Sequence, residues 1–231
     1  MTGRLIGIGL GPGDPELLTL KAVRLLRAAP VIAYPVPDSG VSRARAIAAP
    51  HLGGQQAEIP IDLCMRVDPA PGQAAYDRAA VDIARRLDQG EDVALLCEGD
   101  PLFYGSFLYL SERLAPRFAV EIVPGVASPM AGAAALRLPL ARRNDTFCVL
   151  PATLDTPALT QRLALADAFC IIKLGRHFAR VRALLDTLGL TPHCHYLAHL
   201  TQEGQELSPL ATARAEAPYF SMILGHRKAA A

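Results

Sequence analysis

The first thirty residues change from a short apolar run to a helical pattern of apolar positions. Residues 5–8 read LIGI, whereas Leu18, Ala22 and Leu25 recur three to four positions apart with charged residues between them. A short apolar run is typical of a buried strand, and apolar residues at the second spacing form one face of a helix. This part of the chain is therefore expected to form a strand, a loop and an amphipathic helix.

A glycine-rich loop joins this strand to this helix. The stretch "IGIGLGPGDPELLTL", Ile6 to Leu20, has four glycines within seven residues. Asp14 is a good N-cap because its carboxylate can accept hydrogen bonds from the first free amides. Pro15 is a good first helical residue because it has no amide to leave unsatisfied. The helix is therefore expected to begin at Pro15.

The spacing of these glycines fits neither of the common phosphate-binding loops. If the dinucleotide fingerprint starts at Gly7, its third glycine falls on Pro12, and if it starts at Gly9, that glycine falls on Asp14. Gly13 is not followed by the lysine of a P-loop. A carboxylate at the start of the helix also disfavours a phosphate there. The loop suits a ligand without phosphate that lies against the backbone, or a tight turn that binds nothing.

The alternation of strand-like and helix-like segments continues along the chain. Strands are expected at 30–35, 92–100 and 118–125, and helices at 73–87, 103–114 and 128–138. Alternation of this kind predicts α/β layers around a largely parallel sheet. The segment from Val36 to Pro71 is less regular and is interpreted as a long insertion or as a loop that covers a site.

The polar stretch "LARRND" is the best candidate for a linker between domains. After it, strands are expected at 146–152 and 168–175 and helices at 157–165 and 178–188, followed by the β-type segments "HCHYLAHL" and "YFSMILG". We therefore expect two α/β domains, residues 1–140 and residues 141–231. The second domain is expected to end in mixed or antiparallel strands.

Composition argues against several classes of protein. Of the 231 residues, 51% are hydrophobic, yet no apolar run approaches the length of about 18 residues that a membrane span needs. With no export signal recognised either, we expect a cytoplasmic protein without a membrane partner. The net charge of +1 offers no field for nucleic acid. Five cysteines without a CxxC pair argue against a zinc ribbon or a disulfide framework.

No metal site is expected from the histidines. His193, His195 and His199 lie close together in the sequence, but no carboxylate stands beside them to complete a ligand set. We expect ordinary packed or partly exposed imidazoles. Arginine outnumbers lysine 20 to 3, which a coding bias explains, or which reflects arginines that bind carboxylates with two hydrogen bonds each.

Three loops carry glycine and proline at the end of an expected strand. They are "GLGPGD", "CEGDPLFYG" from Cys97 to Gly105, and "VPGVAS" from Val123 to Ser128. Ligands of open α/β sheets bind beyond the carboxyl ends of the strands. Each loop alone is compatible with simple turn chemistry. The three together, on one edge of one sheet, favour a binding cleft.

These motifs resemble those of a known family. The trio "GxGPGDPELLT", "GDPxxYG" and "PGVxS" is similar to the signature of the tetrapyrrole methylases, which are S-adenosylmethionine-dependent methyltransferases of cobalamin and siroheme biosynthesis, with diphthine synthase as a relative. The similarity runs from Leu5 to about Arg227. "CEGDPLFYGSFLYL" and "PYFSMIL" most resemble the subgroup that methylates C20 of precorrin-2, and Glu98 stands where other members carry a second glycine.

The resemblance implies the fold, the cofactor and the residues that contact it. It implies two α/β domains with S-adenosylmethionine bound in a cleft between them, a small-molecule tetrapyrrole substrate and a homodimer. Leu174 and Leu200 stand where the family often has methionine and glycine. The implied cofactor-binding residues are Pro12, Glu98, Gly99, Asp100, Phe103, Ala127, Ser128, Leu174, Leu200 and Thr201.

Substrate charge gives the arginines a possible role. The acetate and propionate arms of the substrate that the resemblance implies make Arg43, Arg45 and Arg66 candidates for substrate binding, together with Tyr104. Three further candidates near the expected cleft are Arg142, Arg143 and Arg176. No catalytic residue is assigned, because the methyl group of a sulfonium is already activated and the expected substrate is a carbon nucleophile. Alignment of the two reactants and exclusion of water are expected to carry the rate.

Three alternatives stay open at this point. The chain could methylate another carbon of a tetrapyrrole, or a protein in the manner of diphthine synthase, although the "CEGDPLFYG" loop argues against the latter. It could also be a module that binds S-adenosylmethionine without turnover. The sequence leaves open whether a tetrapyrrole substrate carries cobalt.

Overall fold

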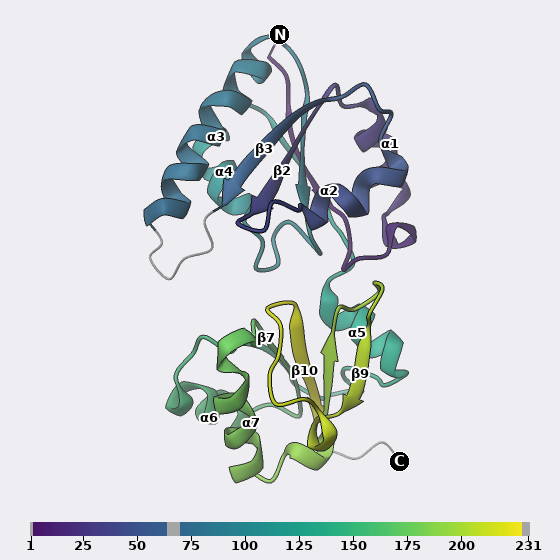
Figure 1. Cartoon of the computed structure of the whole chain (residues 1–231), viewed down its shortest axis with the longest axis vertical. Coiled ribbons are helices and arrows are strands. Elements are labelled where there is room, and N and C mark those ends of the chain that lie inside the picture. The colour runs from purple at the N-terminus through teal and green to yellow at the C-terminus, as the bar shows by residue number, and fades with distance from the viewer. Residues whose placement is uncertain (1, 64–69, 228–231) are drawn as a thin grey trace. The chain divides into compact units, whose positions relative to one another are not determined.

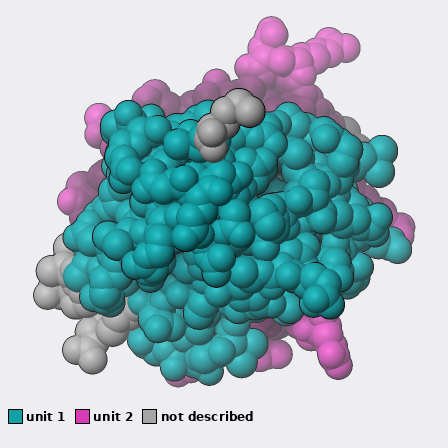
Figure 2. All heavy atoms as spheres, turned by 90° about the horizontal axis from the view of Figure 1, so that it is seen from above, with its two compact units in different colours: residues 1–127 teal, residues 128–231 magenta. Residues whose placement is uncertain are grey.

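The structure is a computed structural model that describes residues 2–63 and 70–227. Its contacts divide the chain into two compact units, residues 1–127 and residues 128–231, which Figure 2 shows in teal and magenta. Each unit holds one five-stranded sheet with helices packed against it, so the expectation of two α/β domains is confirmed. None of the helices in these residues is long and apolar enough to cross a membrane.

The first sheet consists of parallel strands in the order β3-β2-β4-β1-β5. The strands are β1 (Leu5–Gly9), β2 (Val31–Pro37), β3 (Ala57–Leu63), β4 (Val93–Cys97) and β5 (Val120–Val123). The helices are α1 (Leu20–Ala28), α2 (Arg43–Ala48), α3 (Ala70–Asp88) and α4 (Phe107–Leu114). In Figure 1, α3 and α4 cover one face and α1 and α2 the other, with a separate apolar cluster beneath each pair.

The second sheet is mixed and has the order β6-β7-β10-β8-β9. Its strands are β6 (Phe147–Pro151), β7 (Ala168–Ile172), β8 (Cys194–Ala198), β9 (Glu206–Pro209) and β10 (Ser221–His226). β6 and β7 are parallel and the other pairs are antiparallel, as expected. The helices are α5 (Ser128–Leu136), α6 (Thr156–Ala164) and α7 (Phe178–Thr187). Figure 1 shows α6 and α7 on one side of this sheet and α5 on the other.

The division between the units falls after Ala127, whereas the polar stretch around Leu140 suggested a later boundary. The reason is the packing of α5, whose small residues let it approach the second sheet closely. A Cβ added at Gly132 would overlap the side chain of Met222 and crowd that of Leu224. The polar stretch is therefore a connection inside the second unit.

The helix after the glycine loop does not begin at Pro15. Asp14 accepts a hydrogen bond from the amide of Glu16, as an N-cap does, but the turn that follows is a three-residue 3₁₀ helix. The backbone is extended at Leu18, and α1 begins after Thr19, whose hydroxyl accepts a hydrogen bond from the amide of Ala22 at 3.1 Å. Two capping signals lie five residues apart here, and the second one starts the long helix.

Candidate functional site

The three glycine-containing loops meet at one edge of the first sheet, as the sequence predicted. β1 lies between β4 and β5 and runs parallel to both, so the three strands deliver their loops to the same edge. Gly11 and Gly99 exchange two backbone hydrogen bonds, with N···O distances of 3.2 and 2.8 Å. The amide of Gly125 donates to the Oδ2 atom of Asp100 at 3.0 Å, which ties the third loop to the second.

Most of these glycines are needed because the loops pack against one another. A Cβ at Gly125 would overlap the carbonyl oxygen of Gly99, and a Cβ at Gly9 would overlap the amide of Gly125. Gly11 and Gly99 adopt φ values of 75° and 69°, which disfavour other residues. Only open space lies on the side of Gly99 where a Cβ would project. At that peptide a ligand can approach the backbone closely.

Asp100 accepts hydrogen bonds from two loops at this edge of the sheet. Its Oδ1 atom accepts a hydrogen bond from the amide of Leu102 at 2.9 Å, and its Oδ2 atom accepts the one from Gly125. Because α4 begins only at Phe107, Asp100 caps a turn and not this helix. A carboxylate can accept about four hydrogen bonds, so two accepted amides leave capacity for a ligand.

Glu98 and Arg43 form a partly buried pair of opposite charges beside this edge. Burial raises the pKa of Glu98, and the positive charge of Arg43 opposes that shift. Burial likewise lowers the pKa of Arg43, and the negative charge of Glu98 opposes it. Arg43 is the first residue of α2, so this short helix brings an expected substrate-binding residue next to an expected cofactor-binding one.

The other expected substrate-binding residues differ from Arg43 in their surroundings. The Arg45 guanidinium binds Glu58 through two nitrogens, at 2.9 Å from Nη2 and 3.1 Å from Nε, and Tyr34 donates its hydroxyl to the same carboxylate. Hydrogen bonds from Arg45 and Tyr34 lower the pKa of Glu58. Arg45 is therefore already engaged with a carboxylate of this chain. Arg66 lies outside the described residues.

Two neighbouring aromatic residues extend the second loop. Phe103 and Tyr104 pack edge to face with ring centroids 5.1 Å apart. Tyr104 is 46% exposed and has a φ of 57°, an uncommon conformation for a residue with a side chain. The residues from Phe103 to Ser106 form a turn, so the helix expected from Phe103 begins at Phe107. Pro12 and Ala127 lie in the first and third loops.

In the second unit, the expected cofactor-binding residues also gather at one edge of a sheet. β7 and β8 are both antiparallel to β10, which lies between them, so β7 and β8 point the same way. Leu174 follows β7, and Leu200 and Thr201 follow β8. Ser128, by contrast, is the first residue of α5. The Leu174 side chain is fully buried in the core, so a ligand would meet its backbone.

The backbone of these two loops is unusual. Lys173, His199 and Thr201 have φ values of 59°, 48° and 60°, a left-handed conformation that costs about 1–3 kcal/mol for a residue other than glycine. The amide of Thr201 donates to the side chain of Gln205 at 2.7 Å, which helps to hold the second loop in shape. Strained backbone of this kind is often kept at binding sites. No sequence pattern assigned a role to Lys173, and His199 was expected to be an ordinary imidazole.

An exposed aromatic pair at the same edge was also missed. Tyr219 and Phe220 immediately precede β10, and they are 48% and 41% exposed with their rings packed edge to face. The amide of His199 donates to the carbonyl of Phe220 at 3.2 Å, which joins the pair to the loop after β8. The motif "PYFSMIL" contains both residues, so the signal was present in the sequence without an assigned role.

The titratable clusters in the described residues offer no metal centre. No group of three or more histidine, cysteine, aspartate or glutamate side chains in residues 2–63 and 70–227 is arranged to hold an ion. Cys97, Cys170 and Cys194 are buried free thiols, and burial raises the pKa of Cys194 to about 12. Cys64 lies outside the described residues.

Comparisons with known proteins agree on one family. Residues 4–214 match the family described as Tetrapyrrole (Corrin/Porphyrin) Methylases. The "Cobalamin biosynthesis protein CobIJ" of Mycobacterium tuberculosis (strain ATCC 25618 / H37Rv) is 43% identical over 239 residues, which cover 98% of this chain and 47% of that protein. This chain thus spans about half the length of that relative. The "Precorrin-2 C(20)-methyltransferase" of a Sinorhizobium species is 40% identical over 232 residues, which cover 96% of this chain and 94% of that protein.

A solved structure is similar over nearly the whole chain. It is the uroporphyrin-III C-methyltransferase from Thermus thermophilus complexed with S-adenyl homocysteine, with a TM-score of 0.69 and 25% sequence identity. The alignment covers 96% of this chain and 97% of that one. The similarity therefore includes both units.

Proposed function

Because this chain belongs to the tetrapyrrole methylase family, we propose that it transfers a methyl group from S-adenosylmethionine to a carbon atom of a tetrapyrrole. In its narrow form, the proposal names precorrin-2 or its cobalt form as substrate and C20 as the carbon. The observation that carries it is the 40% identity, over 96% of the chain, to a protein named for that reaction. The motifs "CEGDPLFYGSF" and "PYFSMIL" support the same subgroup.

The residues at the two sheet edges fit a methyl donor without phosphate. The donor supplies a methyl group that its sulfonium has already activated. The open side of Gly99 admits a flat nucleoside against the peptide, and Asp100, fixed by two amides, keeps acceptor capacity for hydroxyl or ammonium groups. Lys173, His199 and Thr201, which follow β7 and β8, have the left-handed backbone that is often kept at binding sites. The bound analogue in the Thermus thermophilus relative supports this choice of cofactor.

The protein then accelerates the reaction mainly by positioning the two reactants. A C20–CH₃ bond forms as the S–CH₃ bond breaks, S-adenosylhomocysteine leaves as a neutral thioether that needs no acid, and the C20 proton passes to water. Holding the two reactants in line and excluding water are worth several orders of magnitude in rate. Tyr104 and Arg43 are the proposed substrate contacts. Arg45 is proposed to act indirectly, because its bidentate contact with Glu58 holds α2 in place. The family resemblance further supports a homodimer in the cytoplasm.

Anaerobic turnover with labelled methyl donor tests the proposal. The protein is incubated with metal-free precorrin-2, or with its cobalt form, and with S-adenosylmethionine that carries carbon-13 in the methyl group. We expect one added methyl group by mass spectrometry and the label at the C20 meso position by NMR. Label at a pyrrole carbon such as C11 or C17 would place the chain with another member of the family. Tight binding of S-adenosylhomocysteine without turnover on either substrate would instead indicate a binding module.

Substrate-binding arginines are tested by one variant and one control. Arg43→Ala should raise the KM for the tetrapyrrole about tenfold or more, because a charge-assisted hydrogen bond is worth about 1.5–3 kcal/mol. The affinity for S-adenosylhomocysteine should stay within about threefold. Arg27→Ala, which changes an exposed arginine of α1, is the control and should leave KM unchanged. An unchanged KM in Arg43→Ala would remove this residue from the substrate site.

A further inference from the structure

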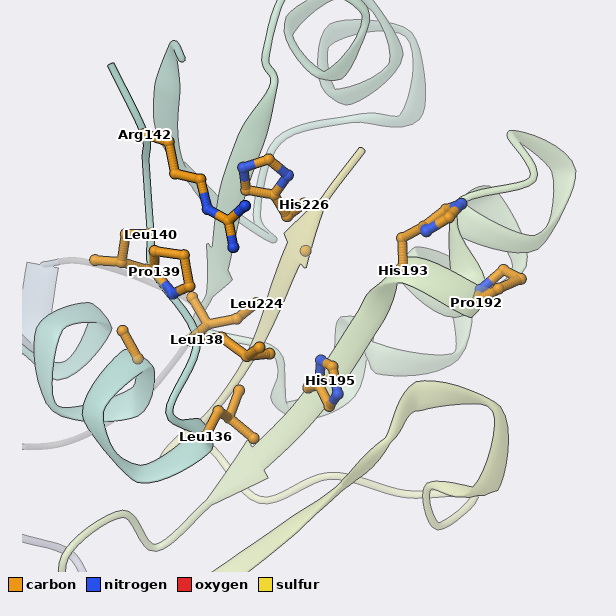
Figure 3. Close-up of a pocket in the computed structure, with 12 residues that line it drawn as sticks. Leu136, Leu138, Pro139, Leu140, Arg142, Pro192, His193, His195, Leu224 and His226 are labelled. Atoms are coloured by element: carbon orange, nitrogen blue, oxygen red, sulfur yellow. The ribbon is translucent and has the colours of Figure 1, made fainter. Parts of the chain in front are cut away.

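A cavity of about 210 Å³ lies within the second unit, on the face of the sheet that α5 covers. Strands β8 and β10 form its floor, where His195 pairs with Leu224. Residues of α5 and the segment after it form its other wall, including Leu136 and Leu138 (Figure 3). Neighbouring residues of a strand face opposite sides, and Tyr196 belongs to the core under α7. The cavity is therefore separate from that core.

The body of the cavity is apolar and limited in size. Figure 3 shows Leu136, Leu138 and Leu224 around its centre, and Pro139 lies beside them. An apolar cavity of about 150 Å³ can hold a benzene molecule. A volume of about 210 Å³ therefore suits one six-membered ring with a short side chain, and it is too small for a tetrapyrrole macrocycle.

One end of the cavity carries a positive charge. The backbone amide of Arg142 donates to Asp145, but its guanidinium makes no hydrogen bond to another residue in the part of the chain that the structure describes. Asp145, whose side chain is only 8% exposed, also lies 3.1 Å from the Nε2 atom of His226, so this carboxylate already contacts two groups of the chain. Among the described residues that line the cavity, Arg142 is the one arginine or lysine, and its guanidinium carries a permanent positive charge.

The opposite wall adds polar groups without adding a fixed charge. His195 points from β8 into the cavity, and His193 lies at its edge (Figure 3). Burial lowers the pKa of His195, so its imidazole is neutral at pH 7. A neutral imidazole still offers one N–H donor. An anion beside Arg142 therefore finds a cation and a neutral donor at the border of an apolar space.

We propose that this cavity binds a small organic carboxylate, with a ring-sized hydrocarbon body between Leu138 and Leu224 and its carboxylate at Arg142. The combination of one cation with apolar walls is what selects this class: a purely apolar molecule gains nothing from the guanidinium, and an inorganic anion gains nothing from the leucines. None of the residues that line this cavity is among those proposed to contact the cofactor.

Binding of 3-phenylpropanoate to the full-length protein tests this inference. Calorimetry and NMR of the histidine side chains are the readouts, with the neutral 3-phenylpropanamide as matched ligand. The carboxylate should bind at least about fivefold more tightly than the amide and should shift the His195 signals. Arg142→Gln should weaken binding of the carboxylate about tenfold, since the charge-assisted contact is lost, and should leave binding of the amide unchanged.

The neighbouring arginine supplies the control. Arg143→Gln removes the charge of another exposed arginine, one that does not line this cavity, and it should leave both affinities within about twofold. Equal affinity for the carboxylate and the amide, or equal losses in Arg142→Gln and Arg143→Gln, would overturn the proposal. So would the absence of binding at millimolar ligand. Affinity that falls as protein concentration rises would also overturn it and would assign the cavity to an interface between two copies of this chain.

Discussion

At the scale of single residues, Glu98 shows how burial and pairing compete. Folding removes water from its carboxylate, and the attraction of Arg43 on α2 offsets only part of this free-energy cost. If one partner of such a pair is removed, the other charge stays buried without compensation. The net effect on the pKa of Glu98 is upward, so burial outweighs the attraction.

This imbalance predicts a pH dependence of stability. Because the pKa of Glu98 is raised above its ordinary value of 4.5, the folded state binds the proton more tightly than the unfolded state does. The contribution of Glu98 to the free energy of unfolding therefore falls as pH rises from 4.5 through the raised pKa. Urea unfolding of the wild type and of Glu98→Gln between pH 4 and 8 measures it. The wild type should lose stability relative to the variant across this window.

Glu112→Gln, at an exposed position of α4, controls for the change from carboxylate to amide. A difference between the wild type and Glu98→Gln that grows in favour of the wild type as pH rises would contradict the prediction. It would mean that the attraction of Arg43 exceeds the cost of burying the carboxylate.

The glycines of the loops predict a graded series of stabilities. In Gly125→Ala the new Cβ overlaps a backbone carbonyl, which cannot move cheaply, so a loss of about 1–3 kcal/mol or more is expected. In Gly99→Ala the Cβ meets open space, and only the positive φ opposes it, at about 1 kcal/mol. Gly53→Ala has neither problem and should change stability by less than about 0.5 kcal/mol. Denaturant midpoints should follow this order.

The same series separates packing from ligand binding. If Gly99 is where a cofactor meets the backbone, Gly99→Ala should weaken S-adenosylhomocysteine binding by more than Gly53→Ala does, although both proteins fold. Equal affinities in the two variants would mean that the open space beside Gly99 is not used.

At the scale of elements, the sequence predicted the helices and strands with strong apolar patterns and missed those without one. β3 alternates partly buried and exposed positions in its first four residues and contains Pro60, and it was missed within a segment interpreted as irregular. Proline is tolerated there because β3 lies at the edge of its sheet. β9 is another edge strand, and its four residues ELSP carry no apolar run. Both strands form because each pairs with a neighbouring strand, and no local sequence pattern indicates such pairing.

The expected start of the first helix failed for a different reason. Asp14–Pro15 and Thr19 are both good capping signals, and local chemistry cannot rank them. The extended residue Leu18, which is 8% exposed, packs in the core under α1 and α2, and this burial separates the 3₁₀ turn from the long helix. Tertiary packing thus decides between two local solutions of similar quality.

The cap of α1 predicts a measurable loss. Thr19→Ala removes the acceptor of the Ala22 amide and should destabilise the protein by about 1 kcal/mol, within the range of about 0.5–2 for such caps. Ser106→Ala is a matched control, because Ser106 occupies the N-cap of α4 without a capping hydrogen bond from its side chain. It should change the unfolding free energy by less than about 0.5 kcal/mol. Equal losses in the two variants would show that the Thr19 hydroxyl is not what caps α1.

At the scale of the whole molecule, the proposed cofactor contacts are shared between two units with separate cores. The sequence motifs could place these residues at strand ends, because the end of an apolar run marks the carboxyl end of a strand. It could not foresee the left-handed backbone at Lys173 and Thr201, since neither residue type favours that conformation. Nor could it foresee that α5 belongs to the second unit, because a helix of small residues has no polar face that marks its partner.

Amide hydrogen exchange then tests the division of the cofactor contacts. S-adenosylhomocysteine at about 100 times its dissociation constant stabilises the bound form by about 2.7 kcal/mol, which is about a hundredfold slower exchange for amides that open only in the free state. We expect protection at residues 9–14 and 98–103 of the first unit and at residues 173–175 and 199–202 of the second. The segment 138–142, which lines the cavity of the second unit, should exchange at an unchanged rate. Protection confined to the first unit would remove Leu174, Leu200 and Thr201 from the proposed contacts while leaving the loops after β1, β4 and β5 in place. Protection absent from both sets, with calorimetric binding intact, would move the cofactor away from these sheet edges altogether.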